Sequence, residues 1–69
     1  MADQQVVGKM GRVTGRIGPD QLGEVMISIR GGTESFHAYA TDRADLIAIG
    51  AQIVVVDYLP PRTVIVTAL

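Results

Sequence analysis

The chain has 69 residues, a formal net charge of −1, one His and no Cys. A chain this short buries only about 60% of its unfolded surface, so it forms one small domain with a thin core. The lack of Cys excludes disulfides, thiolate zinc sites and cysteine catalysis. Without a positive excess, a generic electrostatic nucleic-acid binder is disfavoured. No apolar run approaches the roughly 18 residues of a membrane-spanning helix.

The apolar residues are of the kind that favours strands. Val and Ile together number 16 and Thr numbers five, whereas Leu numbers four. β-branched side chains are stiff at χ1 and pack well on a pleated sheet. Eight Gly and three Pro are spread along the chain, where they indicate turns. The composition therefore predicts an all-β fold.

Residues 1–5 are polar, and we expect them to form a flexible N-terminal tail ahead of one domain at 6–69. Five segments in that domain have the alternating pattern of strands. These segments are Val6–Ile17, Leu22–Arg30, Thr33–Thr41, Ile53–Leu59 and Thr63–Leu69.

The connections between these segments have distinct signals. Gly18-Pro19-Asp20 and Pro60-Pro61-Arg62 predict turns, and Gly31-Gly32 predicts a two-residue hairpin turn. The stretch Asp42–Gly50 breaks the alternation. There we expect Asp42 to cap a short helical turn over Ala44–Ile47.

Three apolar side chains of that stretch, Leu46, Ile47 and Ile49, are expected to plug one end of the fold, and Gly50 to adopt a left-handed conformation. Gly11 and Gly15 fall on the apolar face of the first strand, which predicts sharp curvature with both glycines facing the interior. Five short strands with such corners suit a small five-stranded Greek-key OB-fold barrel, with an SH3-like barrel as the competing fold.

The fourth strand is apolar on both faces. Ile53 and Val55 alternate with Val54 and Val56, although only one face can line a barrel this small. Four outward apolar residues on adjoining strands indicate either a patch that contacts another protein or a flattened barrel that buries some of them. The candidate contact face consists of Val54, Val56, Ile65 and Met26.

An alternative ligand face lies on the second and third strands, which carry the ligand surface of many OB-folds. Its candidate residues are Arg30, His37 and Tyr39, accompanied by Arg12 and Arg16. Single-stranded nucleic acids bind cationic grooves with stacking aromatics. Here the acidic residues cancel the arginines and only one aromatic ring, that of Tyr39, is expected to face outward, so nucleic acid is the weaker alternative.

No residue set supports catalysis, a cofactor or a metal ion. His37 alternates with Phe36 and Ala38, and we expect it to face solvent without converging partners. Asp42 and Asp45 flank Arg43 and lack the acid-rich loop of a calcium site. The Gly8-Lys9 pair lacks the spacing of a phosphate-binding loop. We therefore predict that this domain is not an enzyme.

The order of these features resembles the C-terminal soluble domain of the NfeD-like family. The matching segments are 8–13 (Gly-Lys-Met-Gly-Arg-Val), 23–25 with Ile27, Gly32 with 36–38, the spaced residues Ile47, Gly50, Ile53 and Val55, and Val64 with Val66. The family often has Trp at its core aromatic position, whereas this chain has Phe36. That departure is conservative for packing.

The resemblance implies a five-stranded OB-fold barrel in a parent protein whose transmembrane helices precede this domain. It also implies stomatin- or flotillin-type membrane proteins as partners. Longer members add a serine protease domain, but Ser28 and Ser35 lie in no nucleophile motif. The expected function is therefore a non-enzymatic interaction module, soluble by itself and held at a membrane surface by its parent, which binds such a partner or a second copy.

Overall fold

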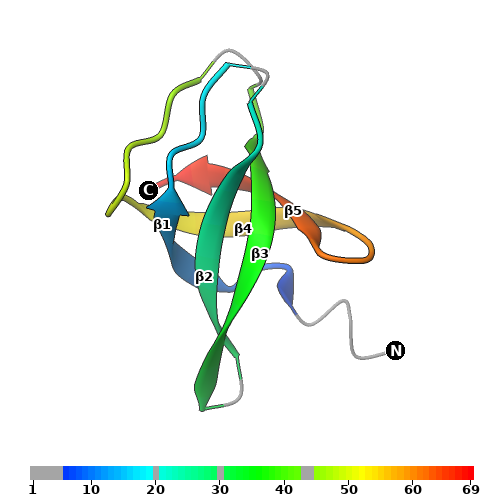
Figure 1. The fold of residues 1–69 in the computed structure, drawn as a ribbon. Coiled ribbons are helices and arrows are strands. Elements are labelled where there is room, and N and C mark those ends of the chain that lie inside the picture. Colours follow the sequence, from blue (N-terminus) through cyan, green and yellow to red (C-terminus); the bar gives the residue numbers. More distant parts are fainter. Residues whose placement is uncertain (1–5, 20, 30, 43–44) are drawn as a thin grey trace.

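The computed structural model describes residues 6–19, 21–29, 31–42 and 45–69, so the expected tail at 1–5 lies outside it. The strands are β1 (Met10–Gly15), β2 (Gly23–Ile29), β3 (Gly32–Ala40), β4 (Gln52–Leu59) and β5 (Thr63–Ala68). They close into a barrel in the order β1-β2-β3-β5-β4, in which β4 pairs with β1 (Figure 1). The β3–β5 pair is parallel and the other four pairs are antiparallel. The predicted five-stranded barrel is confirmed.

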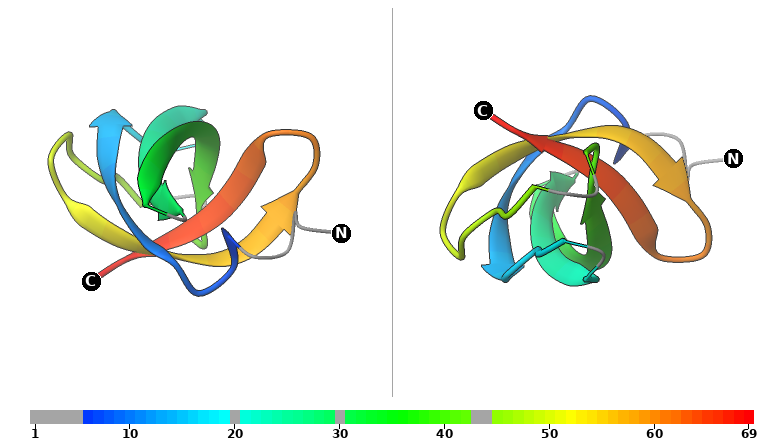
Figure 2. Two further views of the ribbon diagram at one scale, coloured as in Figure 1. Left: turned by 90° about the horizontal axis from the view of Figure 1, so that it is seen from below. Right: turned by 90° about the horizontal axis from the view of Figure 1, so that it is seen from above.

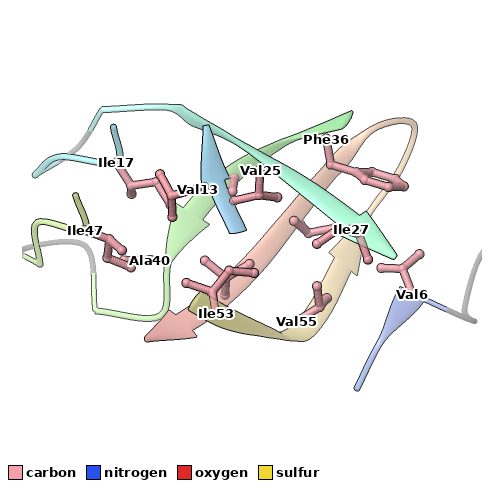
Figure 3. Close-up of a cluster of buried hydrophobic side chains, with 13 residues drawn as sticks. Val6, Val13, Ile17, Val25, Ile27, Phe36, Ala40, Ile47, Ile53 and Val55 are labelled. Atoms are coloured by element: carbon pink, nitrogen blue, oxygen red, sulfur yellow. The ribbon is translucent and has the colours of Figure 1, made fainter. Parts of the chain in front are cut away.

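Alternating side chains of all five strands fill the barrel. Among the described residues, every buried side chain of the core is hydrophobic (Figure 3). Ile17 and Ile47 lie at one end of this core, and Phe36 and Val6 lie toward the other. The core consists of Val6, Val13, Ile17, Val25, Ile27, Phe36, Ala38, Ala40, Ile47, Ile53, Val55, Val64 and Val66.

Two β-bulges change which side chains face inward. One lies between Val13 and Gly15 in β1, and the other between Val55 and Asp57 in β4. Because of the first, Gly15 pairs with the exposed Glu24. A Cβ at Gly15 would lie 3.1 Å from the Glu24 Cβ. The prediction that Gly15 faces the interior is therefore wrong, since the bulge turns it toward the outer surface.

Gly11 and Gly23 are the glycines that close packing requires. A Cβ at Gly11 would overlap the Met26 carbonyl oxygen and lie 2.6 Å from Ile27 Cδ1. A Cβ at Gly23 would overlap Ile17 Cγ1 and lie 2.6 Å from the Gly15 carbonyl oxygen. At both positions backbone atoms crowd the site, so a side chain requires the strands to move apart.

The β2–β3 hairpin turns one residue earlier than predicted. Ile29 pairs with Gly32, so Gly32 begins β3 instead of forming part of the turn. Gly31 has a φ of 79°. The hairpin projects beyond the rest of the barrel at the bottom of Figure 1. β4 and β5 cross β2 and β3 steeply, and their own hairpin extends to one side (Figures 1 and 2).

The connection from β3 to β4 is extended over the residues that the structure describes. Asp45 N–H donates to the Asp42 carbonyl (2.9 Å), which makes one tight turn. Ile47 then forms an antiparallel bridge with Ile17. The predicted helical turn is therefore wrong for its described part, and Ala44 lies outside that part. Two hydrogen bonds to Ile17 hold Ile47 extended in its place.

Of the three residues expected to plug the barrel, only Ile47 does so. Leu46 and Ile49 are 62% and 65% exposed. Gly50 has a φ of 93°, as predicted, and its N–H donates to the Val13 carbonyl (2.8 Å). In the described parts of the chain, no helical segment has both the length and the apolar composition needed to cross a bilayer.

Candidate functional site

An apolar surface lies on the outer side of β4 and β5. The pairing of β4 with β1 places Met10 directly beside Val54, whose other neighbour is Thr67 of β5. Met10 is 52% exposed, and Val56, which is the extra residue of the β4 bulge, is 44% exposed. Val54 is half-buried and faces away from the core.

Ile65 continues this surface along β5. It is half-buried and lies between Tyr39 of β3 and Asp57 of β4. Ile65 stands two residues before Thr67, which is the partner of Val54, so the two apolar side chains are diagonal neighbours. We call the surface formed by Met10, Val54, Val56 and Ile65 the outer apolar face.

Met26 does not belong to this face. It lies on β2, where its neighbours are Arg12 of β1 and Ser35 of β3, so a whole strand separates it from β4. Ser35 Oγ donates to Met26 Sδ at 3.2 Å. The sequence does not show that β4 pairs with β1. Met10 was therefore not identified as a member of the face, although it lies beside Val54, where Met26 was expected.

The alternative ligand face is only partly described, because Arg30 lies outside the described residues. His37 is exposed and pairs with Glu24 of β2 and Thr63 of β5. Tyr39 is half-buried beside Ile65. Arg12 is exposed on β1, and Arg16 is exposed directly after the end of that strand. The structure thus brings His37 and Tyr39 to one side of β3 but places Tyr39 at the margin of the outer apolar face.

No catalytic constellation forms among the described side chains. His37 has Glu24 as its cross-strand neighbour, but the serines lie elsewhere: Ser28 is exposed on β2, and Ser35 donates to Met26. In the described parts of the chain, no three or more His, Asp and Glu side chains lie close enough together to hold a metal ion.

A cluster at the β4–β5 hairpin was not predicted. The Phe36 and Tyr58 rings meet edge to face with centroids 6.5 Å apart, and Arg62 Cζ lies 5.0 Å from the Phe36 centroid. Tyr58 Oη donates to the Pro61 carbonyl at 2.7 Å, across a turn whose Pro60–Pro61 bond is cis. The sequence signals were the lone Phe and the Pro-Pro-Arg turn, but only the barrel topology joins them.

This chain is similar to a known domain family and to solved structures of its members. The family model for the NfeD C-terminal domain matches residues 10–67. The solution structure of the soluble domain of the NfeD protein YuaF from Bacillus subtilis is 32% identical with a TM-score of 0.81, over 94% of this chain and 75% of that one. No curated protein sequence gives a significant match.

A second solved structure agrees with the first. The C-terminal domain of the stomatin operon partner protein 1510-C from Pyrococcus horikoshii is 26% identical with a TM-score of 0.76, over 94% of this chain and 89% of that one. The five-stranded barrel and the family match together confirm the OB-fold expected from the sequence. The matched domain is of a non-catalytic type. This chain belongs to the NfeD C-terminal domain family.

Proposed function

We propose that residues 6–69 act as one protein-contact module and that the outer apolar face is its contact surface. The observation that carries the proposal is the two-sided apolar character of β4. Ile53 and Val55 are 0% and 1% exposed in the core, yet Val54 and Val56 lie on the opposite side of the same strand. When a partner covers an apolar outer face, that surface is removed from water and the free energy of the complex falls.

The partner in this proposal is a stomatin- or flotillin-like membrane protein. Support comes from the name of the similar Pyrococcus horikoshii protein, which is a stomatin operon partner. In the proposed setting, a parent protein holds the module at the membrane surface beside its partner. Tethering both proteins in one membrane raises their effective concentration, so a small face suffices for a contact that is weak between separate molecules.

The test places a charge in the face of the complete gene product. Val54→Glu with Val56→Glu is expected to abolish co-purification with a stomatin- or flotillin-like protein of the same organism. Burying a carboxylate against an apolar surface without a partner charge is strongly unfavourable. The isolated variant domain is first checked by circular dichroism and by its urea midpoint.

The matched control is Gln21→Glu with Ser28→Glu, which adds the same two negative charges at exposed positions before and on β2. It is expected to leave co-purification unchanged. Retained binding by the folded Val54→Glu, Val56→Glu variant would reject this face. Equal loss in both variants would show that net charge, and not the outer apolar face, determines the association.

A further inference from the structure

The barrel leaves half of β3 unpaired on one side. β2 pairs with β3 along residues 32–38, whereas β5 pairs only with residues 37–40. The N-terminal half of β3 therefore has one open edge, and it belongs to the hairpin that projects from the barrel (Figure 1). Open edges present backbone donors and acceptors that another strand can pair with.

The backbone groups on this edge follow from alternation along the strand. His37 N–H donates to the Arg62 carbonyl (2.9 Å), so this residue points toward β5 and away from β2. In an antiparallel ladder every second residue points to the same side. Thr33 and Ser35 therefore direct their N–H and C=O groups to the open edge, where β5 does not reach.

The Arg62 side chain occupies the place of the missing strand. Its Nη2 donates to the Ser35 carbonyl at 2.7 Å, as the N–H of a neighbouring strand would. The guanidinium carbon lies 5.0 Å from the centroid of the Phe36 ring. The same nitrogen is 3.8 Å from Glu34 Oε2, in a pair whose side chains are 52% and 55% exposed. An ion pair so exposed contributes little stability, so the carbonyl and ring contacts define this position.

We propose that the open edge of β3 is a strand-pairing surface whose occupant is the same edge of a second copy, and that Arg62 holds it closed. Two copies of one strand edge pair antiparallel about a twofold axis, so a second identical chain presents the complementary backbone donors and acceptors. The hairpin projects beyond the barrel, so two edges meet before the barrels collide. Cationic side chains at an edge are a recurrent device against such pairing. This inference is independent of the outer apolar face.

The test is Arg62→Met, which keeps an aliphatic side chain beside Phe36 but removes the donor to Ser35. In sedimentation equilibrium the parent domain is expected to be a monomer and the variant a concentration-dependent dimer. In the variant, Glu34 no longer has Arg62 beside it, so the Glu34 carboxylates of two paired copies repel each other. The measurement is therefore made at about 1 M salt, where charges more than roughly 3 Å apart are screened. The amides of Thr33 and Ser35 are expected to gain hydrogen-exchange protection in the variant.

A second change separates strand pairing from other association. Arg62→Met with Thr33→Pro removes an N–H donor from the open edge, a position where proline is tolerated. This double variant is expected to return to a monomer. A folded Arg62→Met protein that stays monomeric would overturn the proposal. So would a dimer without protection at Thr33 and Ser35, or a parent domain that already dimerises through this edge. If Arg62→Met does not fold, Arg62→Leu, which also lacks a donor and a charge, replaces it with the same expected and contrary outcomes.

Discussion

At the scale of single residues, Gly23 sits where a side chain has no room. The nearest backbone atoms to an added Cβ are the carbonyl oxygens of Gly15 and Arg16, at 2.6 and 2.9 Å. Gly23→Ala is therefore expected to lower the free energy of unfolding by about 1–3 kcal/mol, the usual cost of overpacking. Urea denaturation of both proteins measures the difference.

The matched control is Gly32→Ala, because the nearest atom to a Cβ there is the Ile29 carbonyl oxygen at 3.9 Å and no positive φ is involved. Its unfolding free energy is expected to stay within about 0.5 kcal/mol of the parent value. Equal losses in the two variants would show that glycine content, and not the contact of Gly23 with β1, sets the cost.

The glycines also show what the sequence can predict at this scale. The positive φ of Gly50 follows from a local signal, because Gly commonly ends a turn in that conformation. The position of Gly15 does not, because a bulge moves it to the outer surface and nothing in the alternation marks the extra residue. The crowding at Gly23 depends on Ile17 and on the Gly15 carbonyl, which approach it through the pairing of β1 with β2.

At the scale of strands, the two sides of the β4–β5 ladder differ in burial while carrying the same residue type. Ile53 is 0% exposed, whereas Ile65 is half-buried on the outer side. Ile53→Val is expected to cost about 0.5–1.5 kcal/mol of stability, because it leaves a void in a filled core. Ile65→Val, the same chemical change, is expected to cost less than about 0.5 kcal/mol. Urea midpoints that shift equally would contradict the assignment of the two faces.

The β4–β5 turn provides a second prediction at this scale. Tyr58→Phe keeps the ring against Phe36 but removes the hydroxyl that donates to the Pro61 carbonyl at 2.7 Å. We expect a loss of about 0.5–1.5 kcal/mol, the net contribution of one hydrogen bond, toward the lower end because this bond is exposed. Thermal unfolding followed by circular dichroism measures it. An unfolding midpoint that Tyr58→Phe leaves unchanged would show that this hydrogen bond does not stabilise the fold.

Among the elements, the strands and the turn at 60–62 were predictable, whereas the connection from β3 to β4 was not. Period-2 alternation identified all five strands, because each has one face in the core. The stretch before β4 misled the sequence interpretation, because its apolar residues suit a short helix in isolation. Two hydrogen bonds between Ile17 and Ile47 override that local preference. The Arg62 contacts with Ser35 and Phe36 likewise depend on strands that are distant in sequence.

At the scale of the whole molecule, charge and surface together oppose binding of single-stranded nucleic acid. The net charge is −1, and neutralising phosphates requires a positive excess. Stacking requires aromatic rings in a row. Across the strands usual for OB-fold ligands, the described outward rings are the exposed His37 and the half-buried Tyr39. We therefore expect a dissociation constant weaker than about 10⁻⁴ M at physiological salt.

Fluorescence anisotropy of a labelled single-stranded DNA oligomer, measured at low and at physiological salt, checks this prediction. Arg30→Ala and Tyr39→Ala are measured beside the parent domain. A micromolar affinity that falls with salt and is lost in either variant would contradict the prediction and make the β2–β3 face a nucleic-acid site. Weak binding that appears only at low salt and is equal in all three proteins agrees with it. Non-specific attraction to phosphates depends on salt and not on any one side chain, and the same data then leave the outer apolar face as the surface to test for a partner.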